Sequence, residues 1–213
     1  MREWTFCLLL LAAFLAACTR KAPVPAFNGV DLTRAHYAQD FQLTDFNGRV
    51  RHLSDFRGKV VVLFFGYTHC PDVCPTTLTD LALAMRRLGR RADQVQVLFI
   101  TVDPARDSPR VLKEYVPAFY PSFLGLYGTP AQTAATAQAF HVFYRKQGSG
   151  PDYSVDHSAG CYVYDRTGKL RLYLPYGEGP KAIAQDLSRL LGRRGKVGTW
   201  SGRGVEEKVP FSI

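Results

Sequence analysis

The chain has little cysteine and lacks several familiar motifs. Only five cysteines occur in 213 residues, and so few in so long a chain exclude a disulfide-dense scaffold. There is no internal repeat, no glycine-rich phosphate loop and no GxSxG motif, which removes the sequence basis for a repeat protein, a P-loop protein or a hydrolase with a nucleophile elbow. Hydrophobic residues at 46% and aromatic residues at 13% exclude a mainly disordered protein and suffice for one domain with a sizeable core.

The N-terminus resembles an export signal. An apolar run from Cys7 to Ala17 follows Arg2, and it is shorter than the roughly 20 residues that a membrane-spanning helix needs. The run ends in LAAC, which resembles a bacterial lipobox with Cys18 as the lipidated residue. An ordinary signal peptide cleaved at a small residue is the alternative. We therefore expect an exported protein, lipid-anchored on the periplasmic side of a bacterial membrane.

These signals divide the chain into four predicted parts. They are a lipoprotein signal peptide (1–17), the lipidated cysteine with a flexible tether (18–35), the folded domain (36–193) and a mobile, basic, glycine-rich tail (194–213). Loss of Cys7 with the signal and lipidation of Cys18 leave Cys70, Cys74 and Cys161 in the domain. This odd number suggests that the thiols serve chemistry rather than cross-linking.

The formal net charge is +9, with basic clusters in RRLGRR (86–91) and in the tail near Arg193. A basic patch can bind nucleic acid, but an exported protein meets little of it, so we expect no nucleic-acid partner. Anionic lipid or an acidic partner protein fits better, and a solvated helix face is the alternative.

Two apolar runs predict the centre of the fold. KVVVLFFGY (59–67) is unbroken and β-branched, which is typical of a strand buried on both faces. Apolar residues then recur at helical spacing from Leu78 to Leu88, and the second run, VQVLFITV (95–102), follows. Strand, helix and strand in this order predict a βαβ unit with parallel strands.

Turn and capping signals complete the predicted fold. The Asn-Gly pair at 47–48 predicts a hairpin before the βαβ unit. Ser108 and Thr129, each followed by proline, predict helix starts, and we expect the first of these helices to end before Pro117. A strand pair and a helix after Pro180 follow. This order predicts an α/β, thioredoxin-like sandwich: a central mixed β-sheet flanked by helices, with an N-terminal β-hairpin.

The segment GYTHCPDVCP (66–75) places Cys70 and Cys74 each directly before a proline. Because proline disfavours the α conformation in the residue before it, we expect neither cysteine inside a helix, with Cys74 at the N-cap and Cys70 in the preceding loop. The positive helix end would lower both thiol pKa values, giving thiolates near neutral pH. Such a pair suits a redox couple or a soft metal ion, and the three-residue spacing favours the metal. A structural disulfide ranks last, because so small a loop restrains little of the unfolded chain.

A third ligand would have to come from the histidines. His157, in SVDHSAGCYVYD, lies in a polar loop before an apolar strand. In a thioredoxin-like sheet the entrance of that strand lies near the N-terminus of the first helix, where the cysteines are. His69 directly precedes Cys70 and could tune the site without binding the metal. His157 is therefore the strongest candidate, with a surface position as the alternative.

Three segments carry a family resemblance. FFGYTHCPDVCP, TVDPARDSPRVLKEY and VDHSA, in this order, resemble the Sco/SenC family of copper-binding cytochrome c oxidase assembly proteins over about residues 38–192. The resemblance implies a thioredoxin-like fold and one copper ion bound by Cys70, Cys74 and His157. It also implies delivery of that ion to the binuclear copper site of cytochrome c oxidase. Family members usually have a transmembrane helix, so a lipidated Cys18 is a different anchor.

Two functions fit these residues. As a copper chaperone the protein would bind Cu(I), with Cu(II) as the other state to consider, since two thiolates and an imidazole are soft ligands. An oxidised pair offers no thiolate, so we expect a periplasmic thiol reductase as a partner, beside the oxidase subunit and other copper chaperones. The alternative is a thiol-disulfide oxidoreductase in which Cys70 and Cys74 are catalytic. That function tolerates loss of His157, whereas tight copper binding does not.

A peroxidase is disfavoured. Peroxiredoxins place threonine or serine three residues before the reactive cysteine, and Tyr67 and Pro71 occupy those positions here. Cys161 is expected to be a small buried residue in the strand CYVYD. Asp103 and Asp156 lie in the segments that resemble the family. For both residues two roles stay open, a structural one and support of the metal ligands.

Overall fold

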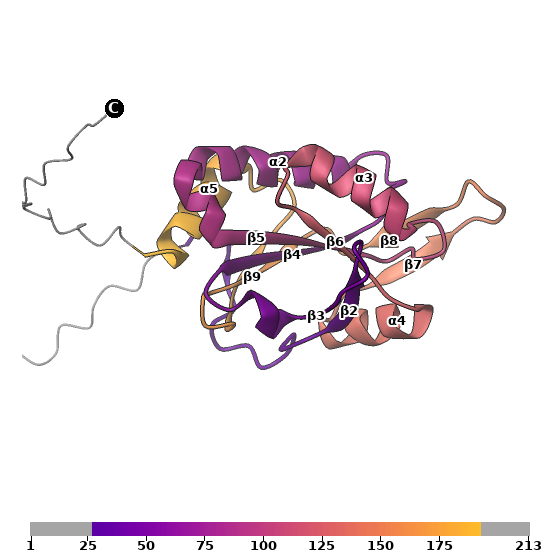
Figure 1. The fold of residues 1–213 in the computed structure, drawn as a ribbon, viewed down its shortest axis with the longest axis horizontal. Helices are drawn as coiled ribbons and strands as arrows, with labels where there is room; N and C mark the ends of the chain where they lie inside the picture. The colour runs from indigo at the N-terminus through magenta and orange to yellow at the C-terminus, as the bar shows by residue number, and fades with distance from the viewer. Residues whose placement is uncertain (1–26, 193–213) are drawn as a thin grey trace, which may run out of the picture.

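The computed structural model describes residues 27–192, so the predictions for the signal peptide, for Cys18 and for the tail lie outside the described residues. One large sheet runs through this part (Figure 1). Its strands are β1 (Val30–Asp31), β2 (Gln42–Asp45), β3 (Val50–His52), β4 (Val60–Gly66), β5 (Val95–Thr101), β6 (Leu124–Tyr127), β9 (Cys161–Tyr164) and β10 (Leu170–Leu174). Across the sheet they stand in the order β1-β10-β9-β4-β5-β6-β2-β3.

The centre of the sheet is formed by β4 and β5. They pair in parallel from Val60 with Val95 to Gly66 with Thr101, and every residue of both strands is buried. β6 continues the parallel part, whereas β9 pairs antiparallel with β4. The βαβ unit predicted from the two apolar runs and the mixed sheet predicted from the order of the elements are therefore confirmed.

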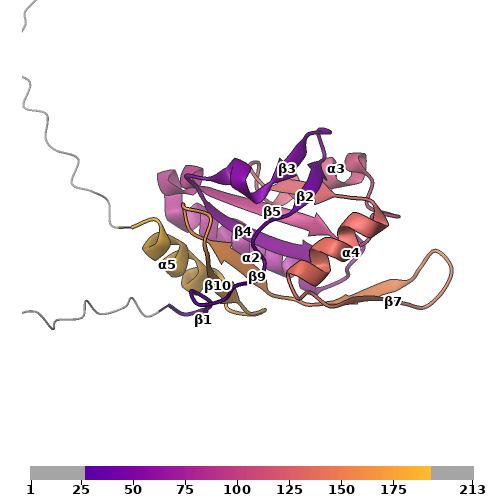
Figure 2. The same cartoon turned by 90° about the horizontal axis from the view of Figure 1, so that it is seen from below.

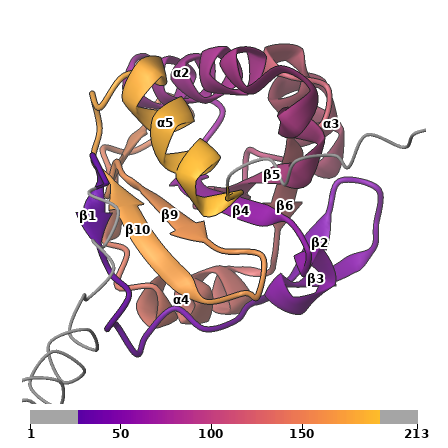
Figure 3. The ribbon, with the colours of Figure 1, turned by 90° about the vertical axis from the view of Figure 1, so that its left-hand side faces the viewer.

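Helices cover both faces of the sheet. α2 (Val73–Leu88), α3 (Pro109–Phe119) and α5 (Pro180–Leu190) lie on one face, and α4 (Pro130–Ala139) lies on the other (Figure 3). The two predicted caps are present, since Ser108 accepts a hydrogen bond from the Val111 N–H and Thr129 forms a capping box with Gln132. This is the thioredoxin-like sandwich. Within residues 27–192, no helix is both long and apolar enough to cross a membrane.

Two local predictions are corrected. α3 does not end before Pro117 but continues to Phe119, because a proline in the last turn removes only one helical hydrogen bond. The folded part also begins before residue 36. β1 pairs with β10, and the backbone N–H groups of Asn28 and Gly29 donate to the buried carboxylate of Asp186 at 3.0 and 2.8 Å. Part of the predicted tether is thus held on the domain.

A hairpin projects from the domain beside α4 (Figure 2). It consists of β7 (Tyr144–Gln147) and β8 (Ser154–His157), which form a separate two-stranded sheet. Tyr144 pairs with His157 at its base. His157 is therefore the last residue of a short strand and not, as expected, part of a loop.

Candidate metal site

The two cysteines come from the turn that links β4 to α2. The N–H of Cys70 donates to the carbonyl of Tyr67 at 3.3 Å, which folds the loop back toward the end of β4. α2 has Asp72 as its N-cap, so Cys74 is the second helical residue, and its expected place at the N-cap, outside the helix, is wrong. Proline is compatible with this start, because Pro75 lies in the first turn, where backbone N–H groups lack intrahelical partners.

His157 reaches the cysteines from the hairpin. Its Nε2 lies 3.3 Å from the Sγ of Cys74, and its Nδ1 lies 2.9 Å from the carbonyl oxygen of Ser158. A carbonyl oxygen only accepts, so Nδ1 carries the proton of the neutral ring and Nε2 presents its lone pair to the sulfur. A hydrogen bond of this kind orients most metal-binding histidines.

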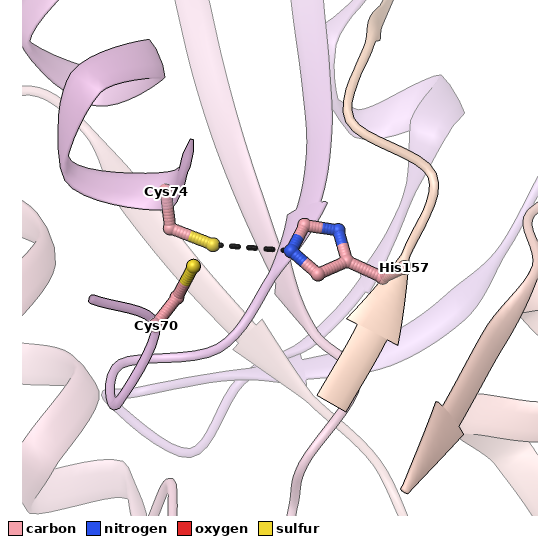
Figure 4. A group of neighbouring side chains, drawn as sticks. All are labelled: Cys70, Cys74 and His157. Atoms are coloured by element: carbon pink, nitrogen blue, oxygen red, sulfur yellow. Dashed lines mark hydrogen bonds between the residues drawn. The ribbon is translucent and has the colours of Figure 1, made fainter. Parts of the chain in front are cut away.

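The three side chains converge on one point (Figure 4). The Sγ atoms of Cys70 and Cys74 and a ring nitrogen of His157 all lie within 4.8 Å of one another. Cys74 is fully buried, whereas Cys70 and His157 are half-buried. Two sulfurs and one nitrogen with partial access to solvent can hold a soft cation such as copper. In residues 27–192 no other group of three such ligands lies this close.

Aromatic rings fix the orientation of the imidazole. The rings of Phe64 and Tyr67 contact His157 edge to face, with centroids 6.1 and 5.8 Å away. Both aromatic residues are buried, so the ring of His157 is confined on two sides. The ligand is thereby held in place before any metal arrives.

Gly66 leaves room for the sulfur of Cys74. A Cβ atom at position 66 would lie 2.9 Å from the Sγ of Cys74 and 2.8 Å from a ring carbon of Phe99. These distances are shorter than van der Waals contact, so any side chain here would displace one of the two groups. The last residue of β4 must be glycine for Cys74 to occupy its present position.

Burial decides the protonation of the ligands. It raises the pKa of the Cys74 thiol well above its ordinary value and lowers the pKa of His157, because the charged forms lose their hydration. The prediction of a thiolate near neutral pH is therefore wrong for Cys74, where desolvation outweighs the helix N-terminus. A bound cation reverses the balance, because its charge stabilises the thiolate directly.

Asp107 anchors the loop between β4 and α2, which carries Cys70. This residue was not identified from the sequence. Its buried carboxylate accepts hydrogen bonds from the N–H and hydroxyl of Thr68, at 3.0 and 2.6 Å, and from the hydroxyl of Thr101 at 2.6 Å. The loop after β4 is thus tied to the end of β5. Burial raises the pKa of Asp107, against the effect of these donors. The segment TVDPARDSP contains two aspartates, and only Asp103 was singled out.

Asp103 fixes the hairpin that carries His157. It accepts hydrogen bonds from the hydroxyl of Tyr153 and from the guanidinium of Arg106, each at 2.6 Å. The guanidinium carbon of Arg106 also lies 3.5 Å from the centre of the Tyr153 ring. Asp156, in contrast, is exposed and accepts a hydrogen bond from Gln147 at 2.5 Å. Asp103 therefore positions the hairpin, whereas the hydrogen bond of Asp156 lies within the hairpin itself.

The other candidates lie outside the cluster. Cys161 is 3% exposed in β9, opposite Phe64 of β4, and burial raises the pKa of its thiol to about 12. This confirms the expectation of a small buried residue. His69 is exposed and its Nδ1 lies 3.1 Å from the hydroxyl of Thr68, beside the site but not among its ligands. His36, His52 and His141 are not part of the cluster either, and the ring of His141 stacks on Tyr37.

Fold and site together define a thioredoxin-like domain with a Cys-Cys-His soft-metal centre at the start of its first long helix. The family model described as SCO1/SenC matches residues 30–192. The chain therefore belongs to the SCO1/SenC family. The expected family membership is confirmed.

Relatives and solved structures agree with this assignment. The mitochondrial protein SCO2 homolog of Bos taurus is 40% identical over 157 residues, which is 70% of this chain and 58% of that protein, less than two thirds of its length. Copper-bound ScoI of Bradyrhizobium japonicum is 41% identical with a TM-score of 0.66, covering 71% of this chain and 97% of that one. Apo Sco1 of Thermus thermophilus is 43% identical with a TM-score of 0.69, covering 79% and 99%.

Proposed function

We propose that this protein is a copper chaperone that binds one copper ion through Cys70, Cys74 and His157 and delivers it to the binuclear copper site of cytochrome c oxidase. The convergence of these three ligand atoms within 4.8 Å is the observation that carries the proposal. The copper-bound structure of the Bradyrhizobium relative supports the choice of metal. Two sulfurs and one imidazole suit Cu(I) better than Cu(II), because thiolates are soft ligands.

The residues of the site divide the work of loading and release. Cys74, buried at the start of α2, and His157, held by Ser158, are fixed ligands. Cys70 lies in the loop and is half-buried, so its sulfur is the one that an incoming or outgoing ligand can approach. Binding of Cu(I) by two thiols releases their protons to solvent. Exchange of ligands at Cys70 would then pass the ion to the cysteines of the recipient.

A thiol-disulfide oxidoreductase is the second candidate. The observation in its favour is that the sulfurs of Cys70 and Cys74 lie within 4.8 Å of each other with no disulfide between them. Two such thiols can reduce a disulfide of the oxidase copper site. The recipient gains two electrons and two protons, and Cys70 and Cys74 form a disulfide. A periplasmic thiol reductase must then restore the pair.

The place of action is also part of the proposal. The apolar run before Cys18 and the LAAC motif support export and lipid anchoring on the periplasmic side of a bacterial membrane. There the chaperone would receive copper from other copper chaperones and meet the copper-site subunit of the oxidase. The oxidising compartment makes a thiol reductase necessary for both functions, because the disulfide binds no copper.

Metal content and free thiols of the anaerobically purified protein test the proposal. The chaperone predicts one copper per chain, with Cys70 and Cys74 protected from alkylation until the metal is removed. A metal-free protein whose Cys70–Cys74 disulfide is readily reduced, and which takes up no copper after reduction, would overturn it in favour of the oxidoreductase.

A further inference from the structure

A basic pocket lies at the end of the domain away from the metal site. It is an open hollow of about 580 Å³ between the C-terminal part of α2 and α5. Its charged lining residues, which define the basic pocket below, are Arg87, Arg91, Lys181 and Arg189. The lining contains no aspartate or glutamate, so its charge is strongly positive.

Three of the four cations in the basic pocket have no carboxylate partner among residues 27–192. Arg91 donates to the hydroxyl of Ser188 at 2.7 Å and to the carbonyl of Gly192 at 2.7 Å, which are neutral acceptors. Arg87 and Lys181 are exposed and have no ion-pair partner among residues 27–192. Only Arg189 is paired, with the buried Asp186 at 2.8 Å. Arg87 and Lys181 therefore face solvent, and the half-buried Arg91 keeps its charge because its acceptors are neutral.

The N-terminal segment is fixed at the rim of the basic pocket. The Asn28 side chain donates to the Oε1 of Gln185 at 3.3 Å, and Gln185 lines the pocket. Figure 2 shows β1, which follows Asn28, beside α5. The nine peptide steps from Cys18 to Phe27 extend to at most about 30 Å. A lipid on Cys18 would therefore keep the basic pocket close to the membrane surface.

The metal site and the basic pocket lie at opposite ends of the domain. Cys74 and Arg87 stand near opposite ends of α2, about 20 Å apart along a helix that rises 1.5 Å per residue. In Figure 1, α5 and the hairpin with β8 lie at opposite ends of the domain. A surface that meets the basic pocket is thus remote from the ligands Cys70 and His157.

We infer that the basic pocket binds the phosphate headgroups of anionic phospholipids, so that the domain rests on its own membrane with the metal site directed away from it. The inference rests on the proposed lipid anchor at Cys18. Arginine guanidinium groups bind phosphate oxygens in bidentate fashion, and each cation near an anionic membrane strengthens binding by about fivefold. The anchor favours lipid over an acidic protein, because it holds the pocket at a high local concentration of headgroups.

Vesicle sedimentation tests the inference without the anchor. All strands and helices that the structure describes lie in residues 27–192, so an unlipidated chain of residues 19–213 keeps every one of them. It should bind vesicles of phosphatidylcholine with phosphatidylglycerol, release them as salt is raised, and ignore phosphatidylcholine alone. Arg87→Gln with Lys181→Gln should lower the partition coefficient roughly 25-fold. The matched pair Arg110→Gln with Lys113→Gln, exposed on α3, should change it far less.

Several results would overturn the inference. One is that the wild-type chain does not bind the anionic vesicles. Another is that the Arg110→Gln, Lys113→Gln variant loses as much vesicle binding as the pocket variant, which would indicate that net charge rather than this pocket drives binding. In the full lipidated chain reconstituted into anionic vesicles, Lys181 should resist acylation while Lys113 stays reactive; equal reactivity also contradicts it. Copper titration of the Arg87→Gln, Lys181→Gln variant separates the two proposals, because one copper per chain with lost vesicle binding leaves the chaperone function intact.

Discussion

The substitution Gly66→Ala should disturb the metal site, because it places a methyl group against the sulfur of Cys74. The added methyl group would lie 2.9 Å from the Sγ of Cys74, 2.8 Å from a ring carbon of Phe99 and 3.1 Å from one of Phe64. Both rings are fully buried and cannot move without disturbing the core, so overpacking should lower the free energy of unfolding by about 1 to 3 kcal/mol. The sulfur of Cys74 is the other group that can yield, and its displacement should weaken copper binding by about tenfold or more.

Urea unfolding of the reduced, metal-free protein and anaerobic copper titration with a competing Cu(I) chelator measure the two effects. Gly125→Ala in β6 is the matched control, because its Cβ would contact Leu112 at 3.1 Å and no ligand of the metal site. This control should lose some stability and keep the copper affinity of the wild type. Wild-type copper affinity in Gly66→Ala, or an equal loss in Gly125→Ala, would refute the argument that Gly66 positions Cys74.

Three further predictions follow from the site. Cys161→Ala should keep one copper per chain in the same titration, since this buried residue lies outside the cluster; loss of binding would make it a ligand. Asp107→Asn should lower the free energy of unfolding by about 1 to 3 kcal/mol and weaken copper binding. The reason is that only the oxygen of an amide accepts hydrogen bonds, so the variant cannot accept from both Thr68 and Thr101 as the carboxylate does. Unchanged urea unfolding would contradict this. Copper affinity should rise with pH between about 6 and 8, by about tenfold per pH unit for each proton displaced. The reason is that burial raises the pKa of Cys74 and keeps its thiol protonated until the metal binds. A copper affinity that does not change with pH in chelator competition would show that no proton leaves.

The parts of the fold predicted correctly depend on local signals. The runs that became β4 and β5 are apolar throughout, because both faces are covered. Ser108 and Thr129 act as caps through hydrogen bonds to residues three positions later. The convergence of Cys70, Cys74 and His157 was expected from the position of His157 before an apolar strand and from the family resemblance, and the structure brings these residues together.

The parts that were missed depend on contacts distant in sequence. β1 is two exposed residues long and is held by β10 and by Asp186, so no pattern within the segment marks it. The raised pKa of Cys74 comes from burial under the folded chain, which the helix N-terminus alone does not predict. The role of Asp107 depends on its hydrogen bonds with Thr68, which lies 39 positions earlier in the chain.

Anaerobic copper titration of the wild type against His157→Ala tests the central claim most directly. We predict one tightly bound copper ion per chain in the wild type and a loss of about a hundredfold or more in affinity in the variant, because one of three ligands is removed. His69→Ala is the matched control, since this exposed neighbour of Cys70 lies outside the cluster, and it should bind as the wild type does. Unchanged affinity and stoichiometry in His157→Ala would contradict the three-ligand copper site.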